Sequence, residues 1–267
     1  MSIKNKRYGK VEYLKADGIQ VPHCFTTRMT GVSEGIWGSM NIAMHRGDRD
    51  ENVVENYNIL GKCIGFAPED LVMTRQTHSD IVRKVGRGDH LGLDHHKYPE
   101  SDALITNEPG VGLVVFTADC TPILLHDPVT GAVGAVHAGW RGTANGIVKK
   151  AVDMMVAEYG CNPADIHAAI GPNIGQCCFE TDGDVPEALR AVLGKAMDEY
   201  IEQYENGKYH VDLKEANAIW LRRAGVRHIE ISISCTACRP DRFWSHRVTN
   251  GQRGSQGAII LCQGVQP

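Results

Sequence analysis

Two neighbouring stretches decide the fold of this chain, TADCTPILLHDP at residues 117–128 and GAVHAGWRGT at residues 134–143. Short apolar runs lead into and out of them, at 113–116, 123–125 and 132–136. Each run is bounded by turn-forming or polar residues such as Gly, Pro and Asp, a pattern that predicts buried strands. Cys120 and His137 therefore sit at predicted strand ends, where side chains are held in fixed positions. We expect the chemistry of this protein at these two residues.

The composition is that of a globular protein with a substantial core. Of 267 residues, 42% are hydrophobic and 22% charged, and the formal charge is −4. This balance argues against a protein that binds nucleic acid through a basic surface. No apolar run approaches the roughly 18 residues of a membrane helix, and the N-terminus lacks the apolar core of a signal peptide. We therefore expect a cytoplasmic enzyme that neither binds nucleic acid nor enters a membrane.

Periodicity predicts a mixture of helices and strands along the rest of the chain. Amphipathic spacing predicts helices over residues 51–64, 143–159, 186–204 and 212–224. Apolar or alternating runs predict strands over 71–73, 102–105, 166–170, 228–234 and 258–261, and residues 86–100 read as a surface loop with a solvated His95-His96 pair. The predicted helices and strands do not alternate regularly along the chain as they do in a doubly wound sheet, so we expect an α+β protein with mixed layers. No repeat or linker-like stretch interrupts it, which predicts a single domain over residues 1–267.

The residues His78, Cys120 and His137 form a candidate metal site. Two imidazoles and a thiolate suit zinc, and three protein ligands leave a fourth position for water or substrate. Their separations of 42 and 17 residues are not short-range metal spacings. A buried cysteine with two hydrogen-bonded histidines therefore stays open, as does a metal-free dyad with Cys120 as nucleophile and His137 as base. In the dyad, Asp119 or Asp127 would orient the imidazole.

The remaining cysteines are expected to be reduced and structural. Nine cysteines is an odd number in a long chain, which argues against a disulfide scaffold. Most are expected to pack as small hydrophobic side chains, among them Cys24, Cys63, Cys161 and Cys262. A closed zinc site at Cys235-x-x-Cys238 would need two more ligands, and the adjacent Cys177-Cys178 pair has the wrong spacing for the usual second half. We expect ordinary thiols at all four.

Four arginines are candidates for binding an anion. Arg141 and Arg253 stand among glycines, where a guanidinium and backbone N–H groups can converge on one ligand. Arg28 and Arg46 flank a glycine-rich stretch near the N-terminus. For any one of them alone, an exposed arginine in a turn is an equally good interpretation.

Long motifs in a fixed order give this chain a clear resemblance. They are CFTTRMTGVSEGIWGSMNIAMHRGD, TRQTHSDIV, SDALITNEPG, TADCTPILLHDP, AVHAGWRGTANGIV, IGPNIGQCCFE and CTACRPDRFWSHRVTNGQRGSQGA. The chain resembles the zinc-dependent purine nucleoside phosphorylase family, formerly called multicopper polyphenol oxidoreductases or laccases. The resemblance implies a four-layer αββα fold with mixed β-sheets, with His78, Cys120 and His137 as zinc ligands and catalytic residues.

The same resemblance implies the reactions and the substrates. These are phosphorolysis of adenosine, inosine, guanosine and 5′-methylthioadenosine, and deamination of adenosine. The partners would be purine nucleosides and phosphate, so some of Arg28, Arg46, Arg141 and Arg253 should hold phosphate. The chain departs from the family pattern at Thr30-Gly31, where Gly-Gly is usual, and at Gly254-Ser255, where Gly-Arg is frequent. Arg253 would then have to act from a shifted position.

Other classes of function remain as alternatives. A copper-dependent oxidase would need histidines in HxH clusters, and none of the twelve histidines forms such a pair. A hydrolase that edits peptidoglycan precursors could use the same Cys–His or zinc site. A non-catalytic binding module fits least well with a cysteine and a histidine at strand ends.

Overall fold

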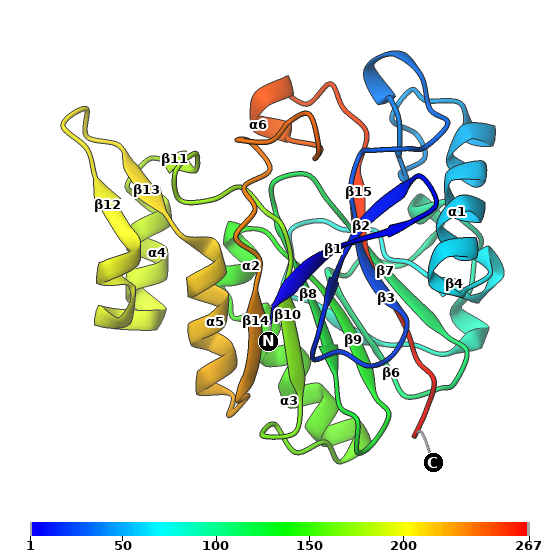
Figure 1. The fold of residues 1–267 in the computed structure, drawn as a ribbon. Helices are drawn as coiled ribbons and strands as arrows, with labels where there is room; N and C mark the ends of the chain where they lie inside the picture. Colours follow the sequence, from blue (N-terminus) through cyan, green and yellow to red (C-terminus); the bar gives the residue numbers. More distant parts are fainter. Residues whose placement is uncertain (1, 266–267) are drawn as a thin grey trace.

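Two six-stranded sheets stacked face to face form the centre of the molecule in the computed structural model, which describes residues 2–265 (Figure 1). The first has the order β1-β2-β3-β15-β7-β4. Its strands are β1 Ile3–Tyr8, β2 Val11–Ala16, β3 His23–Thr26, β15 Gln256–Leu261, β7 Gly112–Thr117 and β4 Leu71–Val72. The second has the order β14-β10-β8-β9-β6-β5. Its strands are β14 His228–Ile231, β10 His167–Ile170, β8 Thr121–His126, β9 Val133–Ala138, β6 Ala103–Thr106 and β5 Val82–Lys84.

Helices cover the outer faces of both sheets, which gives four layers. Helix α1 (Asp50–Ile64) packs into the core of the first sheet, and α3 (Ile147–Tyr159) and α5 (Leu213–Arg223) pack on the second. The fold is therefore the expected α+β class with an αββα arrangement and mixed sheets. None of the helices in the described part of the chain is long and apolar enough to span a bilayer.

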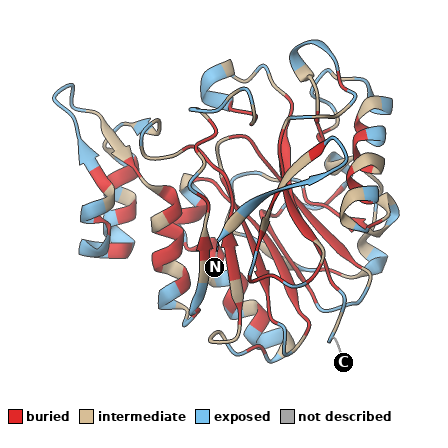
Figure 2. Ribbon diagram, in the orientation of Figure 1, coloured by how far each residue is buried: buried red, intermediate tan, exposed pale blue. Residues whose placement is uncertain are grey.

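The central strands β8 and β9 are buried along their whole length, and most of their residues are apolar because both faces are covered (Figure 2). In β8, Leu124 belongs to the core shared with the first sheet, whereas Ile123 and Leu125 belong to the core under α3 and α5. The predicted strands 113–116 and 123–125 are confirmed within β7 and β8, and the predicted strand 132–136 is confirmed as β9, which begins one residue later and ends two residues later than expected.

Two predicted helices differ from the structure, and a glycine accounts for each difference. The predicted helix 143–159 is divided into α2 (Trp140–Ala144) and α3, because Gly146 between them has a φ of +70°. The predicted helix 186–204 ends much earlier, since α4 (Asp184–Leu193) stops at Gly194, whose φ is +63°. A 3-10 segment, Gly194–Tyr200, follows it.

Residues 201–203 form a strand where a helix was expected. This strand, β12 (Ile201–Gln203), pairs with β13 (Tyr209–Val211), which also pairs with β11 (Glu180–Thr181). The resulting three-stranded sheet stands with α4 to one side of the two large sheets (Figure 1). By contrast, the predicted helices 51–64 and 212–224 are confirmed as α1 and α5. Asp212 caps α5 as predicted by accepting from two backbone N–H groups.

The remaining short helical elements lie in loops. They are α6 (His246–Thr249) and the 3-10 turns Gly35–Trp37, Pro68–Asp70, Arg87–Asp89 and His95–Lys97. The last two fall within the predicted surface loop 86–100, which is therefore more ordered than expected.

Candidate active site

Strand pairing places Cys120 beside His137. The chain leaves the first sheet at the end of β7, turns through residues 118–120, and enters the second sheet as β8. Strands β8 and β9 are antiparallel, with Pro122 opposite His137 and Thr121 opposite Ala138. Cys120 is thus the residue just before β8, next to the end of β9. This placement agrees with the prediction that both residues sit at strand ends.

His78 reaches the same place from the loop between β4 and β5. Gln76 fixes this loop against β7, because its side chain accepts from Phe116 N at 2.6 Å and donates to Phe116 O at 2.8 Å. His78 itself has a φ of +59°, an uncommon value for a non-glycine residue. Its backbone is therefore held in a specific turn that directs the ring toward Cys120.

The donor atoms of His78, Cys120 and His137 lie within 4.8 Å of one another. His78 Nε2 is 3.7 Å from Cys120 Sγ, and the two imidazole rings are 5.0 Å apart in an edge-on arrangement. Burial raises the pKa of the Cys120 thiol, but the charge of His137 and hydrogen bonds from both histidines outweigh burial and lower it. Burial in turn favours neutral His137, yet the neighbouring Cys120 and Asp102 raise its pKa. A thiolate beside imidazole nitrogens is a good set of metal ligands.

Asp102 organises this group of three. Its carboxylate is fully buried and accepts from His137 Nδ1 at 2.7 Å. It also accepts from the backbone N–H groups of Thr77, His78 and Ser79 and from Ser79 Oγ. The first bond fixes a tautomer with the proton on Nδ1, which leaves His137 Nε2 free for a metal. The others hold the turn that carries His78.

The orienting carboxylate differs from both residues suggested by the sequence. Asp127 lies at the other end of β8, where it caps a turn by accepting from Val129 N at 2.8 Å. Asp119 has a φ of +84° and accepts from Thr236 Oγ1 at 2.6 Å and Arg247 N at 2.7 Å. Sequence reasoning missed Asp102 because its role depends on the pairing of β6 with β9, although it lies within the SDALITNEPG motif.

A cavity of about 500 Å³ opens onto the three residues, within the usual range for a small-molecule site. Besides the three, polar, charged and aromatic side chains line it: Arg46, Gln76, His95, Phe116, Asp119, Phe179, His246, Arg247, Arg253 and Ser255.

Two of the four predicted arginines line this cavity. Arg253 Nη1 donates to Gly254 O and Ser255 Oγ, while its buried Nε has no partner among the described residues. Burial, reinforced by the charge of Arg46, lowers the pKa of Arg253 to about 10. Arg46 and Arg253 thus bring two guanidinium groups to one cavity, where the charge of Arg46 disfavours that of Arg253.

The other two arginines lie elsewhere. Arg28 stacks on the Trp244 ring at 3.9 Å and donates to the carbonyl groups of Gly38 and Pro240, so its guanidinium ties two loops together. Arg141 is exposed, stacks on Trp140 at 4.3 Å and is not part of the cavity lining. Arg247, which sequence reasoning did not single out, does line the cavity.

His95 also belongs to this site, although the sequence suggested a solvated residue. Its ring lies 5.0 Å from that of Phe116, and burial together with the charge of His96 lowers its pKa to about 4. Its buried Nδ1 has no partner among the described residues. A neutral imidazole beside a phenyl ring suits contact with a flat, polar ring in the cavity.

The fold and this group of residues define a class: four-layer α+β proteins with a candidate three-ligand His–Cys–His metal site at the ends of central strands. Residues 22–263 match the family model described as multi-copper polyphenol oxidoreductase laccase. The chain belongs to this family.

Named relatives agree with the match. The chain is 39% identical over 241 residues to "purine nucleoside phosphorylase YlmD" of Geobacillus stearothermophilus, covering 88% of each chain. The crystal structure of YlmD from the same organism superposes with a TM-score of 0.90 at 35% identity, covering 97% of this chain and 98% of that one. The chain is also 36% identical over 227 residues to "adenosine deaminase RL5" of an unknown prokaryotic organism, covering 83% and 86%.

Proposed function

We propose that this protein is a zinc-dependent purine nucleoside phosphorylase that also deaminates adenosine. Its substrates would be adenosine, inosine, guanosine and 5′-methylthioadenosine, together with phosphate. The observation that carries this proposal is the meeting of a candidate metal site with two guanidinium groups, Arg46 and Arg253, in one cavity. The names of relatives that cover most of the chain support it.

The residues present fit zinc. Zinc takes thiolate and imidazole ligands at about 2.3 and 2.0 Å, which puts neighbouring ligand atoms of a tetrahedral site roughly 3.3–3.8 Å apart. The distance of 3.7 Å between His78 Nε2 and Cys120 Sγ agrees with this. His137 Nε2 would complete the set, because Asp102 already binds the other ring nitrogen. Zinc bound by these three residues would supply a Lewis acid with an open coordination position.

The zinc assignment also fits better than the multi-copper one. Among residues 2–265, two groups of His, Cys, Asp or Glu side chains have ligand atoms close enough to hold one metal ion. They are this group of three and a group of four cysteines. A trinuclear copper centre would need a cluster of histidines in addition. The described residues hold no further histidine-containing group of this kind, so the multi-copper interpretation of the family description lacks the histidine cluster that it requires.

The chain's own residues would bind and orient both substrates. In phosphorolysis a phosphate oxygen forms a bond to C1′ of the ribose while the C1′–N9 bond breaks, giving free purine and ribose 1-phosphate. Arg46 and Arg253 would hold the phosphate dianion beside the ribose, and their positive charge would favour its binding. Phe116 and His95 would pack against the base. In deamination, water adds at C6 of adenosine and ammonia leaves, giving inosine.

A purine-release assay with and without phosphate tests the proposal. Inosine and phosphate should yield hypoxanthine and ribose 1-phosphate in equal amounts, and removal of phosphate should stop both. Cys120→Ala should lose this activity together with one equivalent of zinc, whereas Cys161→Ala, a buried cysteine far from the cavity, should keep both. Equal rates of base release without phosphate would show a hydrolase instead.

A metal-free Cys–His enzyme is the second candidate. The lowered pKa of Cys120 and the raised pKa of His137 are what a nucleophile and its base require. Asp102 would then orient the imidazolium, and hydrolysis of a peptidoglycan precursor would be one such reaction. Protein that retains full activity after complete removal of zinc would favour this candidate.

A further inference from the structure

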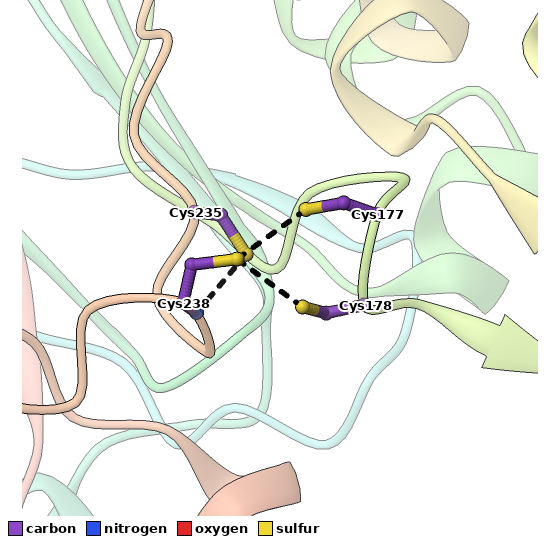
Figure 3. A group of neighbouring side chains, drawn as sticks. All are labelled: Cys177, Cys178, Cys235 and Cys238. Atoms are coloured by element: carbon purple, nitrogen blue, oxygen red, sulfur yellow. Dashed lines mark hydrogen bonds between the residues drawn. The ribbon is translucent and has the colours of Figure 1, made fainter.

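The four cysteines outside the proposed active site meet at one point (Figure 3). Cys177 and Cys178 lie in the loop that precedes β11, and Cys235 and Cys238 lie in the loop that follows β14. Their sulfur atoms all lie within 4.8 Å of one another. Cys238 Sγ is 3.5 Å from Cys177 Sγ and 3.4 Å from Cys178 Sγ. The spacing of these cysteines in the sequence did not predict that the two pairs meet.

We propose that these four thiolates bind a second zinc ion in a closed, structural site. With Zn–S bonds of about 2.3 Å, sulfur atoms at the corners of a tetrahedron lie about 3.8 Å apart. The two closest separations, 3.5 and 3.4 Å, lie slightly below this distance, and all four sulfur atoms lie within 4.8 Å of one another, whereas a disulfide would need about 2.05 Å. Four sulfur ligands exclude the hard cations calcium and magnesium, which prefer oxygen.

Donors around the cysteines fit a negatively charged metal–thiolate group. Cys235 Sγ accepts from Gly175 N at 3.2 Å and from Cys238 N at 3.4 Å. Hydrogen bonds from backbone N–H groups to sulfur stabilise thiolates and orient them. Lys214 is only 6% exposed, and its ammonium group donates to the carbonyl oxygen of Ser234, the residue before Cys235. It also interacts electrostatically with Cys235 and Cys177. A zinc ion with four thiolates carries a charge of −2, which this buried cation partly balances.

The site would join the loop before β11, which lines the cavity at Ile174 and Phe179, to the loop after β14. These segments already touch at the bridge between Asn173 and Cys235. The residue after Cys178 is Phe179, which lines the cavity. Arg247 lines it as well, and its guanidinium donates to Cys178 O at 3.3 Å. A metal that fixes Cys178 therefore fixes the wall that faces the substrate. Zinc binding itself does not depend on which reaction the cavity performs.

Metal content separates the two sites. Protein purified under reducing conditions without added metal should contain about two zinc ions per chain, one per site. The variant His78→Ala/Cys120→Ala should retain one, and Cys235→Ser/Cys238→Ser should retain the other. A matched control, Cys161→Ser, should keep both. In His78→Ala/Cys120→Ala, X-ray absorption at the zinc edge should show only sulfur neighbours, a result that does not require any activity.

The same variants show what the second metal does. Cys235→Ser/Cys238→Ser should lower the unfolding temperature and raise the KM for nucleoside more than it lowers kcat. If that variant does not fold, the absorption spectrum of His78→Ala/Cys120→Ala still decides the matter. The proposal would be overturned if that spectrum showed nitrogen or oxygen neighbours. It would also be overturned if the folded variant held iron in place of zinc, or less than about a fifth of an equivalent of zinc. Titration of all four thiols as free in fully folded protein would overturn it as well.

Discussion

Asp102→Asn offers the sharpest test of how the His–Cys–His group is built. The carboxylate accepts five hydrogen bonds, and Oδ1 and Oδ2 each take at least two of them. An asparagine has one acceptor oxygen, so either orientation of its amide turns an NH2 group toward at least two donors. His137 Nδ1 and His78 N share one oxygen, while Ser79 donates twice to the other. Every orientation of the amide therefore disturbs one proposed zinc ligand, His137, or the turn that carries another, His78.

The expected size of the effect follows from the number of bonds lost. Leaving a buried donor without a partner costs about 1–3 kcal/mol. Because the donors of residues 77–79 are only partly buried, their loss costs less, and Asp102→Asn should lower the free energy of unfolding by about 1–3 kcal/mol in total. Loss of a carboxylate that orients a metal-bound histidine typically weakens metal affinity about 10–100-fold. Asp102→Asn should show both effects. Chelator competition, followed by zinc content and phosphorolysis, measures the affinity, and urea unfolding measures the stability.

Asp127→Asn is the matched control for this variant. Asp127 is also fully buried, and it caps the turn at the far end of β8 by accepting from Val129 N and Thr130 N. Both N–H groups bond to Oδ1, and an asparagine keeps one acceptor oxygen, so this replacement should change stability little and leave zinc affinity unchanged. If folded Asp102→Asn binds zinc within about twofold of the wild type, well below the expected loss, Asp102 does not position the ligands. A comparable loss of affinity in Asp127→Asn would mean that the loss of any buried carboxylate, and not the orientation of the ligands, weakens zinc binding.

Three further outcomes are expected. Cys120→Ala should lose one zinc equivalent, phosphorolysis and deamination together, at a stability cost of roughly 1–3 kcal/mol in urea unfolding; retained deamination would separate the two activities. Arg253→Gln should raise the KM for phosphate at least about tenfold with less effect on the KM for nucleoside, whereas the exposed Arg190→Gln should change neither. Burial lowers the pKa of His23 to about 4, and its neutral ring accepts from Ala16 N. Because the unfolded chain takes up that proton first, His23 should contribute about 3 kcal/mol to the stability that is lost as the pH falls from about 6.5 to 4. Urea unfolding should therefore show a smaller loss over this pH range in His23→Gln than in the wild type.

The fold was largely predictable because its central strands are buried on both faces. Continuous short apolar runs bounded by turn residues, such as those on either side of Cys120, are typical of strands buried on both faces. The helix errors arose where local backbone conformation decides the outcome. Gly146 and Gly194 each adopt positive φ and end a helical turn inside a pattern that remains amphipathic beyond them. The spacing of hydrophobic residues does not indicate where a glycine adopts a positive φ and ends a helix.

The site was predictable only where it is local in the sequence. Cys120 and His137 could be placed because each adjoins an apolar run that ends at the cavity. His78 could be assigned only through resemblance, since its position depends on a loop with little hydrophobic pattern. The four cysteines were missed for a similar reason. The parallel pairing of β10 with β14 brings their loops together across about sixty residues, and no short-range spacing records that pairing.

Asp119 explains why the two proposed metal sites should not be independent. Its backbone carbonyl accepts from Ile174 N at 2.9 Å, and its carboxylate accepts from Thr236 Oγ1 at 2.6 Å. Ile174 and Thr236 belong to the two segments that the four cysteines join, and Asp119 directly precedes Cys120. The turn that carries the only thiolate of the His–Cys–His group is therefore held by the segments that the second zinc would fix. A zinc at the four cysteines would limit the movement of that turn and so favour the geometry in which Cys120 binds the first metal.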